Sequence, residues 1–156
     1  MRLPLVIASI LCSVTYPFAS HAEALKKPSS SRKLGLTIHV EGEGWGSVRK
    51  ETIENVLYSV ADELLTRLPK KLVVPIVVTH TNQHPVAVYQ RGEKGEYRVK
   101  LHASDANWHL YTYEFAHEFC HILSNYEENV GPGVSRYNQW FEETLCEAAS
   151  LYALKN

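Results

Sequence analysis

Apolar residues alternate with polar ones at the start of the patterned part of the chain. In "LGLTIHVEG" every second residue is apolar, which is the period of a half-buried β-strand. The apolar face of this predicted strand consists of Leu34, Leu36, Ile38 and Val40. The stretch "LVVPIVVTHT", residues 72–81, is rich in β-branched residues and predicts a second strand. Pro75 has no N–H to donate to a ladder, so we expect this strand at a sheet edge or at a bulge.

Between these two strands, apolar residues recur at spacings of three and four, which is the period of an amphipathic helix. The apolar positions are Ile53, Val56, Leu57, Val60, Leu64, Leu65 and Leu68. Ser47 is suited to the N-cap of this helix, and Pro69 is expected to end it. This stretch is the strongest helical pattern in the chain.

The second half of the chain predicts a hairpin followed by two helices. "VAVYQ" and "EYRVKLHA" are short strand-like runs separated by the glycine-containing turn "RGEKG". One helix is expected to begin near Thr112, and Gly-Pro-Gly separates it from a last helix at about 138–154. The order strand, helix, strands, helix, helix predicts an α+β fold with a small mixed or antiparallel sheet.

The N-terminus has the features of a cleaved export signal. Residues 1–22 contain an early arginine, an apolar run too short to span a bilayer, and small residues before the expected cleavage point near Ala22. We therefore expect a periplasmic or secreted protein with no stable membrane anchor after cleavage. Residues 23–33 predict a flexible lead-in, and residues 34–156 predict a single domain.

Charge and cysteine content narrow the classes of partner. The chain of 156 residues carries a formal net charge of −1, and removal of the signal, with Arg2 and no acid, makes it about −2. Interspersed charges of both signs offer no electrostatic footprint for a nucleic acid, which we exclude as a partner. Cys120 and Cys146 are the two thiols of the mature chain, and the oxidising compartment implied by export allows them to pair.

The chemistry-bearing motif is "EFAHEFCHIL", in which His117 and His121 are four residues apart. Four residues turn an α-helix by about 400°, so both imidazoles lie on one face, about 6 Å apart along the axis, and can reach one ion. Glu118 lies one step round the helix, where its carboxylate can face a water without binding the ion. Zinc in such a site lowers the pKa of water, and the carboxylate takes the proton as the water attacks a carbonyl.

Two histidines can also fall on one side of a packed helix by chance. The residues around the motif argue against that reading, because a second, apolar face lies away from the histidines. This face consists of Phe115, Phe119, Ile122 and Tyr126. One side of the helix can then meet a core while the other lines a cleft, which favours zinc-dependent hydrolysis.

A catalytic zinc needs a third protein ligand, and the last predicted helix offers carboxylates. In "NQWFEETLCEAASLYAL", Glu143 and Glu147 are four apart, so one can bind the ion while the other stands one turn behind. Here the sequence resembles the gluzincins, the thermolysin-like zinc peptidases, whose third ligand is a Glu downstream of HExxH. "WFEETLCEAAS" is similar to the family segment W-x-N-E-G-x-A-E. The resemblance implies Glu143 as the metal ligand and Glu147 as the acid that hydrogen-bonds a zinc histidine.

The motif departs from the family at two positions, since Glu142 and Thr144 stand where the family usually has Asn and Gly. Glu142 therefore remains an alternative ligand. The other reading of this helix is a solvated acidic face that binds no ion.

The resemblance carries two further expectations. Gluzincins commonly present a strand edge before the zinc helix, and "EYRVKLHA", residues 96–103, is expected to bind an extended peptide there. The family also tends to place a Tyr or His near the oxyanion, and Tyr137 is the candidate here. An ordinary structural role for this tyrosine is the alternative.

The cysteines follow candidate ligands at the same spacing, Cys120 three residues after His117 and Cys146 three after Glu143. If both helices converge on one ion, the cysteines lie on facing sides and a disulfide becomes geometrically feasible. Burial as small apolar residues and metal ligation are the alternatives.

The resemblance implies that residues 34–156 form a minimal, exported zinc metallopeptidase that acts on a peptide or protein. The chain ends thirteen residues after Glu143, so we expect an open cleft that a partner or a narrow substrate would complete. Two alternatives stay open: an exported zinc-binding or structural module without activity, and a toxin-like protein that acts on one host or competitor substrate.

Overall fold

A computed structural model describes residues 35–124, 126 and 138–156 of the chain. The described residues form a mixed four-stranded sheet and three helices, which confirms the predicted α+β class. The elements are β1 (Ile38–Glu41), α2 (Lys50–Arg67), β2 (Ile76–His80), β3 (Val86–Val88), β4 (Tyr97–Leu101), α3 (Trp108–Ser124) and α4 (Gln139–Lys155).

The predicted signal at 1–22 and lead-in at 23–33 fall outside the described residues, so both stay predictions. Leu34, the first residue of the apolar pattern, also falls outside them. Among the helices in the described ranges, none combines the length and the apolar character needed to cross a bilayer.

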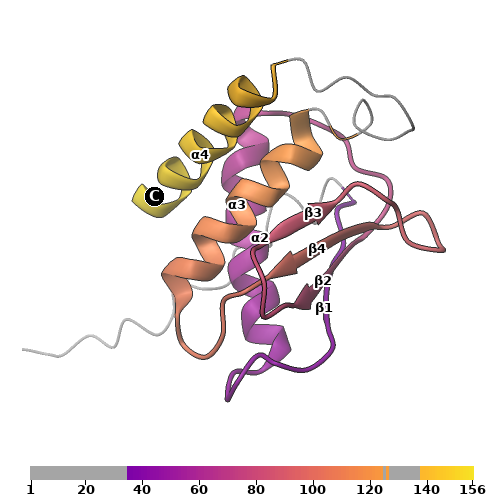
Figure 1. The fold of residues 1–156 in the computed structure, drawn as a ribbon, viewed down its shortest axis with the longest axis vertical. Helices are drawn as coiled ribbons and strands as arrows, with labels where there is room; N and C mark the ends of the chain where they lie inside the picture. Colours follow the sequence, from indigo (N-terminus) through magenta and orange to yellow (C-terminus); the bar gives the residue numbers. More distant parts are fainter. Residues whose placement is uncertain (1–34, 125, 127–137) are drawn as a thin grey trace, which may run out of the picture.

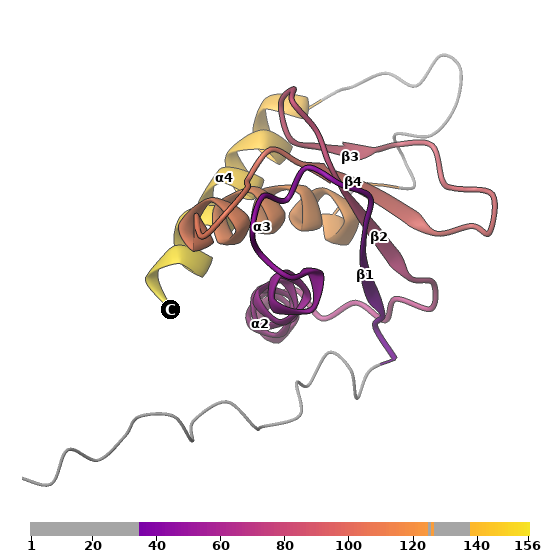
Figure 2. The same cartoon turned by 90° about the horizontal axis from the view of Figure 1, so that it is seen from below.

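The sheet has the order β1-β2-β4-β3, in which the first three strands are parallel and β3 is antiparallel to β4. The inward residues Ile38, Ile76 and Tyr97 lie in one register across the parallel strands. Helices α2 and α3 cover one face of this sheet, and α4 packs on α3 from the far side (Figures 1 and 2). The predicted hairpin is confirmed as the β3–β4 pair.

The expectation that the strand around Pro75 lies at a sheet edge or a bulge is wrong. The strand β2 begins at Ile76, and it is paired on both sides. Pro75 lies just outside the ladder and contributes its carbonyl, which accepts a hydrogen bond from the Tyr97 N–H at 3.0 Å. Because the missing N–H falls before the first paired residue, proline does not prevent β2 from occupying the interior of the sheet.

The expectation that residues 96–103 present a free edge is also wrong. The strand within that range, β4, lies between β2 and β3 and is paired with both. Its backbone therefore cannot receive a further strand. The edge strand on that side of the sheet is β3, which packs beside α3.

The prediction that Ser47 caps the first helix is wrong, since the helix begins later and Ser47 bonds to another loop. Its backbone N–H and its hydroxyl both donate to Asp105 Oδ1, at 3.1 and 3.3 Å, which joins this turn to the loop before α3. The helix α2 starts at Lys50 with Arg49 at the N-cap position. Its end agrees with the prediction, since the helix stops at Arg67, two residues before Pro69.

The core lies between the sheet and the two helices that cover it. From α2 it receives the predicted apolar residues Ile53, Leu57 and Leu64, each at most 2% exposed. Full burial of an aliphatic side chain contributes about 1.5–3 kcal/mol, so this face holds α2 to the sheet. The predicted apolar face is likewise confirmed, because its three residues on α3 and the fourth, two residues beyond the end of α3, are all completely buried. These residues are Phe115, Phe119, Ile122 and Tyr126.

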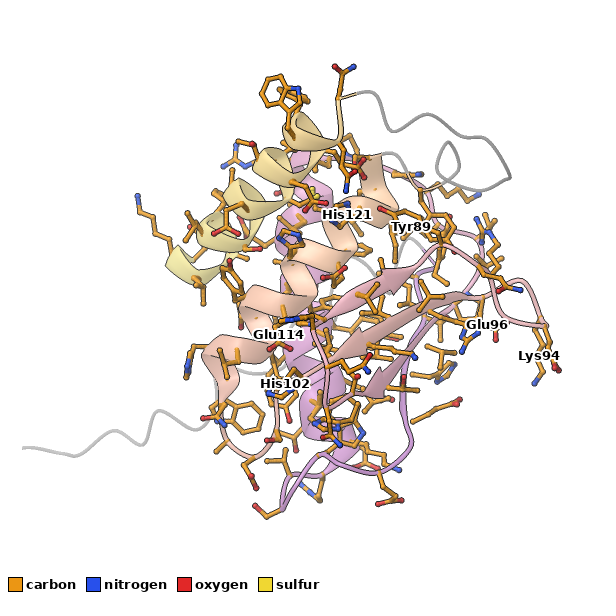
Figure 3. The ribbon with its side chains drawn as sticks, viewed as in Figure 1. Tyr89, Lys94, Glu96, His102, Glu114 and His121 are labelled. Carbon is orange, nitrogen blue, oxygen red and sulfur yellow. The ribbon has the colours of Figure 1, made fainter. Side chains whose placement is uncertain are left out.

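The helix α3 begins at Trp108, four residues earlier than expected, and a buried carboxylate joins it to the sheet. Glu114 Oε2 accepts hydrogen bonds from the backbone N–H groups of His102 and Ala103, at 2.8 and 2.9 Å. Figure 3 shows the Glu114 side chain close to His102, just beyond the end of β4. This contact sets the position of α3, and with it the position of the histidine pair, relative to the sheet.

We predict that Glu114→Gln lowers the free energy of unfolding by about 1–2 kcal/mol, because two charge-assisted backbone hydrogen bonds, one of them buried, are weakened. Chemical denaturation of both proteins measures the change. Glu43→Gln is the matched control, since the Glu43 side chain is 99% exposed and should shift the value by less than about 0.5 kcal/mol. An equal response of the two variants would contradict the anchoring role of Glu114.

Candidate metal centre

The site is built where α4 packs against α3. His117 and His121 project from one face of α3, with their ring centroids 5.0 Å apart. Glu143 comes from the second turn of α4 and faces both rings. One ligand atom from each of these residues lies within 4.8 Å of the others, so these three predicted ligands are brought together.

Both histidines direct the same ring nitrogen toward Glu143. Its Oε2 lies 3.3 Å from His117 Nε2 and 3.6 Å from His121 Nε2. Ligand atoms about 2 Å from a tetrahedral zinc ion stand about 3.3 Å apart, so the observed spacing is close to that of a zinc site. Two imidazoles and one carboxylate are also a common donor set of catalytic zinc. The residues present therefore fit the ion that the sequence predicts.

The other ring nitrogen of each histidine faces a carboxylate. His121 Nδ1 lies 2.8 Å from Glu142 Oε1, and both side chains are buried. His117 Nδ1 lies 3.8 Å from Glu147 Oε2 in a more exposed setting. Each ring thus lies between two carboxylates, and a cation bound at Nε2 would leave the proton on Nδ1, facing Glu142 or Glu147.

The sequence left Glu142 and Glu143 as alternative ligands, and the structure gives them different surroundings. Glu143 lies on the Nε2 side of both rings, whereas Glu142 lies behind His121 on the Nδ1 side. The register along α4 separates them, because adjacent residues of a helix point about 100° apart. Glu147, which the resemblance implies as a hydrogen-bond partner of a zinc histidine, lies 3.8 Å from His117 Nδ1, so this hydrogen bond stays a prediction.

Glu118, the predicted general base, points to the edge strand. Its Oε2 accepts a hydrogen bond from the Ala87 N–H in β3 at 2.6 Å, and the residue is 6% exposed. Burial raises the pKa of this carboxyl to about 7, although the Ala87 N–H and His117 act to lower it. A cation held beside Glu118 would favour its ionised form, which is the form that can accept a proton.

An aromatic residue that follows the edge strand β3 also lies beside the site. Tyr89, the residue after β3, lies edge-on to His121 with the ring centroids 6.5 Å apart (Figure 3). Tyr126 donates a hydrogen bond to the Val88 carbonyl at 2.8 Å and so ties β3 to the residues that follow α3. The site is therefore bounded by α3, α4 and the end of β3.

Sequence reasoning missed two contacts that position site residues. The first is the Ala87 N–H, which no local pattern connects to Glu118 because 31 residues separate them. The second is Tyr113, whose hydroxyl donates to Glu147 Oε2 at 2.6 Å. This hydrogen bond, followed by burial, raises the pKa of the Tyr113 hydroxyl. The sequence spacing could have indicated the Tyr113 contact, since Tyr113 precedes His117 by four residues and lies on the same face of the helix.

The predicted oxyanion residue Tyr137 falls outside the described residues, so its role stays a prediction. The cysteines of the predicted disulfide face each other across the α3–α4 interface as two completely buried thiols. A hydrogen bond joins them, and together with burial it raises the pKa of the Cys146 thiol. The disulfide itself also stays a prediction.

Comparison with known proteins identifies no relative. No protein-family model, curated protein or solved structure matches this chain. The likeness to gluzincins that the sequence motifs suggest therefore stays a prediction.

We predict that the chain folded in glutathione buffer contains a Cys120–Cys146 disulfide. The two thiols would exchange with one oxidised glutathione, which is released as two reduced molecules. Thiol titration in denaturant without reductant should then detect no free thiol. Reduction should lower the free energy of unfolding by about 3 kcal/mol, because the bond closes a loop of about 25 residues. Detection of two free thiols would exclude the disulfide.

Proposed function

We propose that this protein is an exported zinc metallopeptidase that hydrolyses peptide bonds with Glu118 as the general base. The observation that carries the proposal is the approach of both histidine Nε2 atoms to Glu143 Oε2, while each Nδ1 faces a second carboxylate. A solvated acidic helix face would not require either feature. The HExxH spacing and the donor set both favour zinc.

In this proposal His117, His121 and Glu143 hold the ion, which leaves one position of a tetrahedral site open to solvent. Glu142 and Glu147 orient the two imidazoles and increase their basicity. Bound zinc supplies a Lewis acid that polarises a carbonyl group and makes water more acidic. The hydrogen bond between Glu142 and His121 is the better shielded of the two orienting contacts, since these side chains are 10% and 7% exposed.

The proton-transfer role falls to Glu118. Its carboxylate would accept a proton from the attacking water and then donate it to the leaving amine. The Ala87 N–H holds Oε2, and among the described residues no group donates to Oε1. Oε1 is therefore the atom that we assign to proton transfer. A general base of this kind contributes about 10²- to 10⁴-fold to a rate.

The substrate is proposed to lie along β3 in an extended conformation. This replaces the assignment to residues 96–103, since β3 is the edge strand beside α3 and next to the histidine pair. Addition of a peptide to a sheet edge reads mainly its backbone, which suits a peptidase. Because the Ala87 N–H is occupied by Glu118, and its neighbours Val86 and Val88 face β4 by the alternation of a strand, we expect a peptide to bond to the Ala87 carbonyl and to the residues that flank β3.

A partner that completes the cleft stays part of the proposal. Trp140 and Phe141, at the start of α4, are 71% and 58% exposed and pack against each other edge-on. They lie within one turn of Glu143. Apolar side chains this exposed are suited to contact a substrate or a second protein.

The rival function is an exported zinc-binding or structural module. The α3–α4 site would then hold the ion and join the two helices without turnover. The number of ligands argues against this rival, because a structural zinc site closes its coordination with a fourth protein ligand, whereas the described residues bring three ligand atoms together. Measurements of metal content and of peptide turnover distinguish the two functions. A toxin-like role with one target differs only in substrate and would be recognised by its partner.

We predict that the purified protein holds one zinc ion and that Glu143→Gln weakens zinc binding by about 100-fold or more. Glu142→Gln should weaken it less, within the 10- to 100-fold range of outer partners, because its amide oxygen can still accept the His121 N–H. Competition with a chromophoric chelator measures both affinities. A larger loss of zinc affinity for Glu142→Gln than for Glu143→Gln would show that Glu142 is the metal ligand. Absence of zinc from the wild-type protein would contradict the proposed metal centre.

We predict that Glu118→Gln keeps the ion and lowers peptide hydrolysis by at least about 100-fold, because the amide cannot accept the proton of water. A library of unstructured peptides analysed by mass spectrometry provides the assay, and zinc content is measured on the same sample. Glu43→Gln is the control for a surface carboxylate and should keep full activity. Wild-type protein that binds zinc and cleaves no peptide would support the structural module instead.

A further inference from the structure

The two candidate zinc histidines are supported by carboxylates in unequal ways. Glu142 lies 2.8 Å from His121 Nδ1, with both side chains largely shielded from water. Glu147 lies 3.8 Å from His117 Nδ1, with side chains 47% and 21% exposed. An exposed glutamate at this distance has many rotamers, and ordering it against a histidine opposes the contact. A further side chain is therefore needed to hold Glu147 next to His117.

Tyr113 supplies a group in the required place. It precedes His117 by one helical turn, so its ring lies along the same face of α3. Its hydroxyl donates to Glu147 Oε2 at 2.6 Å, and this is the oxygen that lies nearest to His117 Nδ1. A carboxylate oxygen has two lone pairs and can accept from both residues at once. The tyrosine thus restricts Glu147 to rotamers in which it faces His117.

We propose that Tyr113 is a positioning residue that sets the affinity of the metal centre by holding Glu147 against His117. A cation bound at His117 Nε2 makes the Nδ1–H a stronger donor, and a carboxylate already in place accepts it without further loss of side-chain entropy. The inference rests on the proposed metal centre. It assigns to Tyr113 a role in binding the ion and no role in proton transfer.

The test is the zinc affinity of Tyr113→Phe, measured by chelator competition on the full-length protein. We expect a loss of about 3- to 10-fold, smaller than the loss for Glu147→Gln, because Glu147 remains present but less ordered. In a double-mutant cycle the two changes should be strongly non-additive, since Tyr113 acts through Glu147. The midpoint of thermal unfolding of the zinc-free variant should stay within about 2 °C of the wild type.

Tyr152→Phe is the matched control. This tyrosine is on α4, and its hydroxyl accepts a hydrogen bond from Arg67 Nε at 3.0 Å and donates one to Glu63, both on α2. The Tyr152→Phe substitution removes the same hydroxyl oxygen from the same type of side chain, and we expect it to leave zinc affinity unchanged.

Three results would overturn the inference while leaving the metal centre intact: unchanged affinity in Tyr113→Phe, additive losses in the cycle, or an equal loss in Tyr152→Phe. Wild-type protein without zinc would instead overturn the proposed centre itself. Zinc content of the wild type is therefore measured first, and the outcomes are distinguishable.

Discussion

The packing of α4 against α3 is the contact on which the site depends. Every candidate ligand lies on one of these two helices, and the contact surface contains small buried residues that let the helix backbones approach closely. Cys120, Cys146 and Ala149 are such residues. Close approach brings Glu143 to the two histidine rings, whereas a bulkier surface would leave the carboxylate in solvent. Glu114 extends the same constraint to the sheet, because it joins the N-terminal half of α3 to the two residues that follow β4.

The distribution of carboxylates explains why an ion would be stabilising here. Glu142, Glu143 and Glu147 face the ring nitrogens of the two histidines, and Glu118 lies on the same helix as both. Buried carboxylates need partners, and Glu118 and Glu142 have theirs in the Ala87 N–H and His121. Glu143 Oε2 faces the Nε2 atoms of both rings. A divalent cation between these three groups would offset the repulsion that they otherwise share.

The edge strand connects the sheet to the chemistry of the site. Through Ala87, β3 holds the oxygen of the proposed base, and through Tyr89 it covers one side of His121. The antiparallel direction of β3 follows from its short hairpin with β4, which allows no crossover. The same strand therefore positions Glu118, and in the proposed function it would also align an extended substrate next to this residue.

The sequence by itself determined those features that depend on neighbours along the chain. The period of four residues placed His117 and His121 on one face, and the apolar period placed Phe115 and Phe119 on the opposite one. The hairpin and the limits of α4 were also predictable, because glycine-rich turns and helix breaks are local. Tertiary structure alone decided the rest. The interior position of β2, the different surroundings of Glu142 and Glu143, and the contact of Glu118 with β3 all depend on which segments pack together. Such contacts join residues far apart in the chain, and a single sequence records no period for them.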